Sequence, residues 1–186
     1  ADPNFVAADL IAQAEHDVNA QSILITNNKN FIQLVNISLK KQLKNLPKKN
    51  IASQSLKNFG LAIFAKGNKN ILKAINTIAP EHLEICTNMN IEIVKGVKNA
   101  GSIFIGKFSP EAIGDYIAGP NHVLPTSGSA RFSSGLSVND FLKRHSLIKI
   151  TKTGIERLGA SVINLAKHEN LEGHANSVKI RLKKGN

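Results

Sequence analysis

The residues best suited to chemistry lie in one short stretch, residues 114–126, which reads Gly-Asp-Tyr-Ile-Ala-Gly-Pro-Asn-His-Val-Leu-Pro-Thr. It places Asp115 and His122 on either side of a Gly-Pro pair, and Pro125 closes the segment. Glycine permits positive φ and proline locks φ at about −65°, so these residues fix the backbone. A rigid turn that presents an acid and an imidazole suits a polar site, and the same pattern also suits an ordinary loop with solvated side chains.

Two further pairs combine an amide or an acid with a histidine. Gln13 and His16 lie three residues apart in a helical pattern, so they project from adjacent turns of one side and could supply two metal ligands. An amide oxygen is an unusual zinc ligand, and a solvated helix face also explains this pair. Glu81 and His82 are neighbours in a turn or helix start, where they could divide general-base work, although such neighbours also occur by chance.

The carboxy-terminal part adds a third group of acids near a histidine. Residues 169–174 read Glu-Asn-Leu-Glu-Gly-His at the start of a helical pattern, where Glu172 could also be a simple cap. The sequence has six histidines, one cysteine and no His-Glu-x-x-His motif, so a metal site would have to be assembled from residues distant in sequence. It contains no glycine-rich phosphate loop and therefore shows no nucleotide site of its own.

The elements that would position these groups alternate along the chain. The pattern predicts strands at residues 21–26, 59–65, 91–94 and 102–105, and helices at 6–17 and 30–46, with a basic connector between Pro47 and Phe59. It predicts a further helix that starts at Asn68 or Asn70 and whose apolar face includes Ile71, Ile75 and Ile78. This alternation indicates an α/β fold with a parallel sheet covered by helices. In such sheets, sites form where loops leave the carboxyl ends of the strands, and the segment at 114–126 follows the last strand and a short helix.

A change of pattern predicts a domain boundary near residue 135. Residues 130–135 are small and polar, so we expect a first domain at 1–135 and a small, mainly helical one at 136–186. The second would hold a short helix at 138–143, a strand at 147–151, a helix at 154–168 and a last helix from about residue 173. It is too small for a core of its own, so it must pack on the first domain or on another subunit.

Composition restricts the class of protein. The chain has 186 residues, is 42% hydrophobic and carries one cysteine, Cys86, which suits a globular protein of a reducing compartment, the cytoplasm. It has no apolar run long enough to span a membrane and no visible signal peptide, and we expect no membrane partner. It begins with Ala1-Asp2-Pro3 and lacks an initiator methionine, which suggests the interior of a longer protein.

The net charge of +11 raises the question of nucleic-acid binding. Only four of the 24 basic residues are arginine, and Tyr116 is the one tyrosine in a chain without tryptophan. Base readout favours arginine, and RNA or single-stranded DNA binding favours stacking aromatics, so we expect no nucleic-acid partner. A non-catalytic basic binding module that retains the fold remains the alternative function.

Taken together and in order, these groups resemble the carboxy-terminal half of histidinol dehydrogenase. The resemblance covers essentially the whole chain with compatible spacing, and the block Asn-His-Val-Leu-Pro-Thr is very specific to this family. The matching segments are Phe5–Leu10, Gln13–Asp17, Ala79–Leu83, Gly114–Tyr116, Gly119–Thr126, Ala130–Ser134, Asp140–Phe141, Glu169 and His174–Val178.

The resemblance implies a fold and a reaction. The family has an incomplete Rossmann-like parallel sheet with helices on both faces, plus a small, mainly helical appendage that swaps between two subunits. In the family, one Zn²⁺ per site holds the substrate, L-histidinol, and NAD accepts two hydrides in succession by way of histidinal, which gives L-histidine. The chain would therefore be a piece of a dehydrogenase of histidine biosynthesis that works as a homodimer with a shared active site.

It also implies a role for single residues. The metal-ligand positions, which also contact substrate, are Gln13, His16, Asp115 and His174. The catalytic pair is Glu81, which would activate water, and His82, which would take the substrate's proton. The remaining substrate contacts are His122 and Glu169. In the shared site, one chain would supply Gln13, His16, Glu81, His82 and Asp115, and the partner subunit would supply Glu169 and His174.

The sequence departs from the family in length. The family's chain is about twice as long, and the half that carries most NAD contacts and part of the substrate pocket is absent, so the cofactor-binding residues stay unassigned. We therefore expect the 186-residue chain by itself to be inactive. A zinc hydrolase, with Glu81 as water activator, is a third possibility, but the chain has no hydrolase motif.

Overall fold

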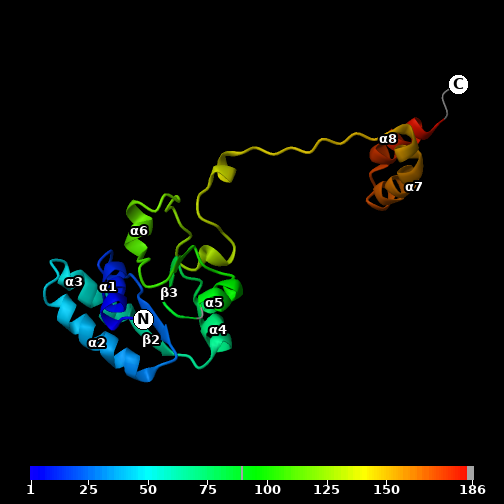
Figure 1. Ribbon diagram of the computed structural model, residues 1–186. Coiled ribbons are helices and arrows are strands. Elements are labelled where there is room, and N and C mark those ends of the chain that lie inside the picture. The colour runs from blue at the N-terminus through cyan, green and yellow to red at the C-terminus, as the bar shows by residue number, and fades with distance from the viewer. Residues whose placement is uncertain (89, 184–186) are drawn as a thin grey trace. The chain divides into compact units, whose positions relative to one another are not determined.

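Two pairs of short parallel strands carry the fold. In the computed structural model, which describes residues 1–88 and 90–183, β1 (Ile23–Thr26) pairs with β2 (Leu61–Phe64), and β3 (His82–Ile85) pairs with β4 (Ser102–Ile105). Eight α-helices accompany them in the described part of the chain (Figure 1): α1 (Pro3–Ala14), α2 (Lys29–Leu43), α3 (Lys49–Phe59), α4 (Asn68–Ile78), α5 (Asn90–Gly96), α6 (Glu111–Tyr116), α7 (Lys152–His168) and α8 (Glu172–Leu182). The predicted α/β class with parallel strands is confirmed.

The chain divides into two compact units, Ala1–Phe141 and Leu142–Asn186. All strands belong to the first unit, where α1, α2 and α3 pack beside β1–β2, and α4 and α5 lie beside β3 (Figure 1). The division between the units falls between Phe141 and Leu142, whereas the sequence predicts a domain boundary at 135/136.

The first helix begins where the sequence supplies a cap. The Asp2 carboxylate accepts the Asn4 amide hydrogen at 2.7 Å, and proline occupies the first turn, where its missing N–H costs nothing. The helix buries Ala7, Ile11 and Ala14. The buried Ser22 hydroxyl donates to the Leu10 carbonyl at 2.9 Å and so ties the helix to the start of β1.

The core joins the two strand pairs. Ile75 of α4, Ile85 of β3 and Ile93 of α5 are buried together, and Ile25 of β1 packs against them. Burial of such side chains is worth about 2 kcal/mol each. This cluster packs against one face of β3. Because successive side chains of a strand alternate between faces, polar side chains can occupy the opposite face.

Several predicted elements are wrong. The segment predicted to be a basic connector contains α3. Its buried residues, Ala52 and Ser55, have helical spacing, but both are small and the segment is rich in lysine, so the sequence shows no clear apolar face. The supposed strand at 91–94 belongs to α5, since a short apolar run does not distinguish a strand from a helix. Residues 147–151 form no strand, and the third strand is instead His82–Ile85, where polar and apolar side chains alternate.

The second unit is a pair of packed helices. Gly159 of α7 allows the close approach, because a Cβ there would lie 2.7 Å from the Leu182 side chain of α8. The side chains buried in this pair are small, Ala166 and Ala175, while Leu165 is 67% exposed. An apolar surface of this kind on a two-helix unit is typical of an interaction face.

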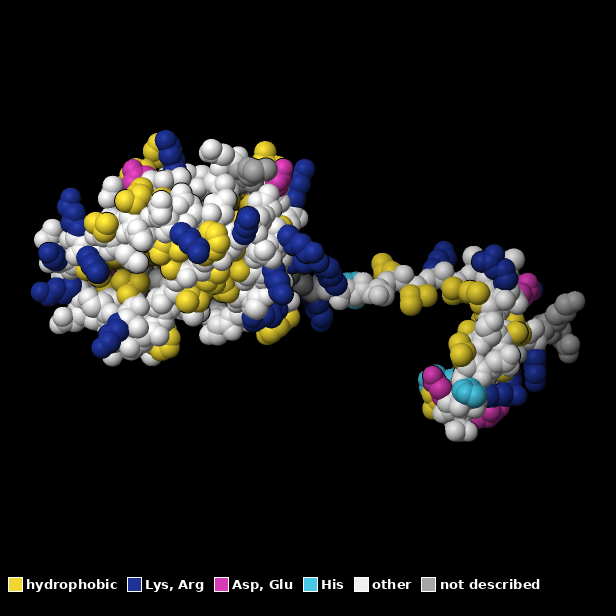
Figure 2. Space-filling model, turned by 90° about the horizontal axis from the view of Figure 1, so that it is seen from below, with side chains coloured by type: hydrophobic (Ala, Val, Ile, Leu, Met, Phe, Trp, Pro, Cys, Tyr) yellow, Lys and Arg dark blue, Asp and Glu magenta, His cyan; other side chains and the backbone are white. Residues whose placement is uncertain are grey.

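Basic side chains do not form one continuous patch on the face that Figure 2 shows. Lysine and arginine lie in separate groups over the larger unit, interspersed with hydrophobic side chains. None of the described helices is both long and apolar enough to cross a bilayer.

Candidate functional site

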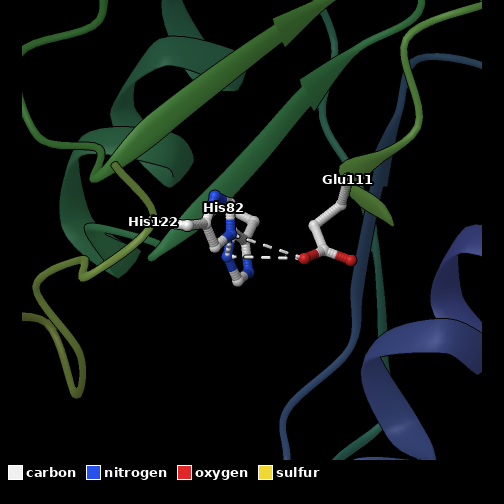
Figure 3. Close-up of side chains that lie close together, drawn as sticks. All are labelled: His82, Glu111 and His122. Atoms are coloured by element: carbon white, nitrogen blue, oxygen red, sulfur yellow. Dashed lines mark hydrogen bonds and ion pairs between the residues drawn. The ribbon is translucent and has the colours of Figure 1, made fainter. Parts of the chain in front are cut away.

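Two histidines lie against each other on the free face of β3. The Nε2 atoms of His82 and His122 are 2.8 Å apart, and the rings are stacked with centroids 4.9 Å apart (Figure 3). The short distance requires that one ring donates a proton and the other accepts it. Phe104 of β4, whose ring centroid is 6.3 Å from that of His82, lies beside both rings.

A buried carboxylate faces this pair. Glu111, the first residue of α6, is only 7% exposed, and its Oε1 lies 3.7 Å from Nε2 of His82 and 3.6 Å from Nε2 of His122 (Figure 3). This oxygen has no hydrogen-bond partner among the described residues. One turn later on α6, Asp115 reaches Nε2 of His122 at 3.1 Å. An unpaired buried carboxylate oxygen is costly and indicates a partner such as a proton, substrate or cation.

Burial shifts the pKa values of these groups away from their ordinary values, downward for the histidine and upward for the acids. Desolvation, followed by the nearby His122, lowers the pKa of His82 to about 4, so its imidazole is neutral near pH 7 and can accept a proton. Desolvation and a hydrogen bond with Asp115 raise the pKa of Glu111 to about 7. Burial also raises the pKa of Glu81, against the opposing charges of His122 and His16.

The backbone before β3 explains how Glu81 and His82 reach this place. Helix α4 ends at Ala79, a buried residue with φ of 52°, and Pro80 prevents the helix from continuing. The strand then begins at His82 rather than in the predicted turn or helix start. A Cβ at Gly101 would lie 2.6 Å from the Glu81 carbonyl oxygen, so glycine is needed where β4 starts beside it.

The segment at 114–126 begins inside α6 and then folds back over β4. A Cβ at Gly114 would lie 2.7 Å from the Phe104 ring and 2.9 Å from the His122 ring, so glycine lets the helix lie directly on both. Gly119 has φ of 98° and reverses the chain, which brings His122 back toward Asp115. The Gly-Pro break therefore holds the acid and the imidazole in contact.

The site lies on the face of the β3–β4 pair and not at the carboxyl ends of the strands. His82 is the first residue of β3, and Glu84 follows it on the same face because strand side chains alternate with a period of two. Helix α6 runs back over this face from Glu84 toward His82. The expectation of an edge site was wrong because a short helix after β4 reverses the direction of the chain.

Two overlapping groups of side chains could hold a metal ion. The ligand atoms of His16, Glu111 and Asp115 lie within 4.8 Å of one another, and so do those of His82, Glu111 and His122. Both groups share Glu111 and its unpaired oxygen. Imidazole and carboxylate donors in this number suit a zinc ion with open coordination positions.

The predicted site residues fall into two sets. His16, Glu81, His82, Asp115 and His122 lie in one neighbourhood of the first unit. Gln13 is half-buried near the end of α1, which stops at Ala14, so His16 stands in the following turn and not on the helix itself. The second unit contains Glu169, the C-cap of α7, and His174, in the first turn of α8, and both are exposed.

Sequence reasoning missed three acids in or beside this neighbourhood. Glu111 precedes Asp115 by four residues, the spacing that puts two side chains on one helix face, and it could have been found from that. Asp9 precedes Gln13 by the same interval on α1, and Glu84 lies two residues after His82. The spacing of Asp9 and Glu84 became informative only when α1 and β3 were known to carry them.

Comparisons with known proteins agree with these observations. The family model for histidinol dehydrogenase matches residues 1–182. The chain is 50% identical over 181 residues to the histidinol dehydrogenase of Caldanaerobacter subterraneus subsp. tengcongensis, covering 97% of this chain and 42% of that protein. It is 51% identical over 182 residues to that of Pelagibacter ubique, covering 98% and 42%, respectively.

A solved structure gives the same result. The crystal structure of histidinol dehydrogenase from Elizabethkingia anophelis matches 98% of this chain with a TM-score of 0.92 and 40% identity, and the match covers 42% of that protein. The chain thus spans well under half the length of the relatives that it matches. With a family model over nearly its whole length and relatives of this identity, the chain belongs to the histidinol dehydrogenase family.

Proposed function

We propose that this chain is the part of a histidinol dehydrogenase that binds zinc and carries the catalytic acid–base pair. The whole enzyme would oxidise L-histidinol to L-histidine with NAD, in two hydride transfers by way of histidinal, in the cytoplasm. The observation that carries the proposal is the gathering of His82, Asp115 and His122 around the buried carboxylate of Glu111 in a member of this family.

The zinc-binding residues proposed here are Gln13, His16 and Asp115, completed by His174 from a second copy of the chain. The closeness of the His16 and Asp115 ligand atoms supports this set, and the unpaired oxygen of Glu111 supports a cation nearby. When bound, zinc would act as a Lewis acid toward the amino alcohol and lower the pKa of its hydroxyl.

His82 and Glu81 would divide the proton transfers. The neutral Nε2 of His82 accepts the hydroxyl proton as hydride leaves, and its low pKa keeps it in the accepting form at neutral pH. Glu81 takes a proton from the water that hydrates histidinal, a role supported by its raised pKa, since a better base holds a proton more readily. His122 and Glu169 would contact the substrate.

Glu111 would orient the two imidazoles. Its carboxylate faces both Nε2 atoms from under 4 Å, so it can hold the rings in one orientation and set which nitrogen carries the proton. The NAD contacts would lie mostly in the part of the enzyme that this chain does not cover. The apolar surface of α7 would pack against a second subunit, which supports the shared site.

The proposal is tested by joining the chain to the part of the Caldanaerobacter relative that the chain does not cover. We expect the joined protein to reduce NAD in the presence of histidinol, to lose this activity with a chelator and to regain it with zinc. The 186-residue chain alone should be inactive. Activity that persists after zinc removal, or in a His82→Ala variant of the joined protein, would contradict the proposed mechanism.

The same preparation decides between the proposal and a basic binding module. A folded joined protein that is inactive, is indifferent to zinc and binds nucleic acid with strong dependence on salt would favour the module. Hydrolysis of an ester or amide without NAD would favour a zinc hydrolase instead.

A further inference from the structure

Two acids outside the proposed catalytic and metal-binding set meet where the three elements of the site converge. Asp9 lies on α1, one turn before Gln13, and Glu84 lies on β3, on the same face as His82. The side chains of Asp9 and Glu84 hydrogen-bond to each other. Both are partly buried, so the bond is shielded from competing water.

Glu84 also binds the start of α6. Its Oε1 accepts the backbone amide hydrogen of Glu111 at 3.0 Å. The N-cap of α6 is Pro110, which offers no side-chain acceptor, so Glu84 satisfies one of the free amides at this helix end from another element. One carboxyl group therefore contacts the helix that carries Asp115 and, through Asp9, the helix that carries Gln13.

The hydrogen bonds define how the two acids share a proton. Desolvation, followed by the charge of Asp9, raises the pKa of Glu84 to about 8, and burial raises that of Asp9. Two carboxyl groups that hydrogen-bond to each other must share a proton, and the Oε1 of Glu84 accepts the Glu111 amide hydrogen in addition. Two apolar side chains would fill this place with less desolvation, but they could not accept the Glu111 amide hydrogen.

We propose that Asp9 and Glu84 form a positioning pair that joins α1, β3 and α6 and so sets the spacing between the metal-binding side chains and the catalytic pair. Neither residue touches substrate or metal in this role. The inference rests on the proposed function for its catalytic consequence, but the hydrogen-bonded junction itself is a property of this chain.

Two substitutions at Glu84 separate hydrogen bonding from simple filling of space. Glu84→Gln keeps an oxygen that accepts from Glu111 and an N–H that donates to Asp9, as the protonated acid does. Glu84→Leu fills the position and removes both bonds. Asp9→Ala removes the hydrogen bond from the side of α1. This variant replaces Glu84→Leu in the test if circular dichroism shows that Glu84→Leu does not fold. Substitutions of Glu156, an exposed acid of α7, to the same two residues are the matched controls.

The first measurement is hydrogen exchange of the Glu111 amide in the 186-residue chain, which needs neither zinc nor substrate. Glu84→Leu should speed this exchange at least about tenfold, as expected when a local bond opens. Glu84→Gln and both Glu156 variants should leave it within about threefold, because the isosteric bonds remain. Unchanged exchange in Glu84→Leu, or equal acceleration in Glu84→Gln, would overturn the positioning pair.

The second measurement is zinc affinity and steady-state kinetics of the joined protein described above. Glu84→Leu should lower zinc affinity and kcat by about 10–100-fold, as loss of an outer support of a metal site does, with a smaller change in KM. Glu84→Gln should restore both. If the unsubstituted joined protein shows no zinc-dependent activity, the proposed function fails, whereas the exchange result still decides whether the junction exists.

Discussion

The candidate functional side chains are packed together in the first unit of this chain and exposed to solvent in the second. In the first, the imidazoles of His82 and His122 and the carboxylate of Glu111 are packed together on one face of a strand pair. In the second, Glu169 and His174 are exposed on a pair of helices held by small residues. A preformed cluster can be a site within its own unit, whereas an exposed pair acquires a role only through something that packs on it.

The two units also differ in how much apolar surface they bury. The first unit surrounds Ile75, Ile85 and Ile93 with apolar neighbours and so has a core. The second buries Gly159, Ala166 and Ala175 and leaves its larger apolar side chains, such as Leu165, exposed. This difference supports a second unit whose apolar surface is covered by another protein surface.

The largest expected effect comes from substituting one histidine of each unit in the joined protein. His82→Ala should lower kcat by about 10²–10⁴-fold, as loss of a general base does. His174→Ala should abolish zinc-dependent activity by removing a ligand. If the second unit completes the site of a partner, mixing the two inactive proteins should restore activity to about one quarter of the original, because half the dimers are mixed and one of their two sites is intact.

The measurement is NADH formation after unfolding and refolding the mixture. His145→Ala, at an exposed histidine to which no role is assigned, is the control and should retain full activity. If the mixture stays inactive although both dimers form, the shared site is refuted and the second unit must act within its own chain.

A glycine substitution in each unit tests how tightly the first is packed. Gly114→Ala should destabilise the chain by about 1–3 kcal/mol, because the new methyl group would overlap the Phe104 and His122 rings. Gly173→Ala in α8 meets nothing within 4 Å and should be neutral or stabilising by up to about 1 kcal/mol. Urea unfolding of both variants is the test, and equal effects would show that α6 does not lie on Phe104 as described.

Acid substitutions should have opposite effects in the two units. Glu111 has a pKa raised to about 7, so the unfolded state loses its proton first and the stability of the folded state falls as the pH rises from about 4.5 to 7. Glu111→Gln should remove this decline and raise stability near pH 7 by about 1 kcal/mol, after allowance for solvent screening. It should also lower the activity of the joined protein.

Glu172 provides the comparison in the second unit. Its ion pair with Lys179 at 2.7 Å lowers the pKa of its carboxyl, so its contribution is present above its ordinary pKa and is lost as the pH falls. Glu172→Gln should therefore reduce stability slightly at neutral pH and have no effect in acid. Thermal unfolding with chelator present, from about pH 4 to about pH 8, covers both windows. A Glu111→Gln variant that is less stable near pH 7 would contradict the assignment of Glu111 as a buried carboxyl group with a raised pKa.

The smallest expected change in stability comes from the exposed apolar face. Leu165→Gln on α7 should alter the unfolding free energy of the chain by less than about 0.5 kcal/mol, because this side chain is largely exposed. It should nevertheless weaken dimerisation of the joined protein if α7 packs on a second subunit. Sedimentation of the variant at several concentrations is the measurement, and Lys167→Gln on the same helix is the control. Unchanged dimerisation would place the interface elsewhere.

Much of the fold was predictable because local signals were strong. The helices α1, α2, α4 and α7 and the strands β1, β2 and β4 follow from apolar spacing, caps and the proline at position 47. Helix α3 and strand β3 were missed for one common reason. In both elements, polar residues stand at positions that contact other parts of the chain. A search for regularly spaced apolar residues therefore does not detect these two elements.

The residues of the candidate site other than Glu111 were identified in order along the sequence, through family-specific motifs such as Asn-His-Val-Leu-Pro-Thr. Their chemical types were sufficient for that: imidazoles, carboxylates and an amide, set among glycines and prolines that restrict the backbone. The family, the α/β class and candidate residues such as His16, Asp115 and His122 could therefore be inferred without a structure.

The interactions among these residues depend on how distant elements pack together. It placed the site on the face of β3–β4, brought in Glu111 and joined α1, β3 and α6 through Asp9 and Glu84. The physical reason is desolvation. Burial depends on which elements pack over a side chain, and burial is what lowers the pKa of His82 and raises that of Glu111. A carboxylate becomes a site residue when its neighbours exclude water, and those neighbours come from distant parts of the chain.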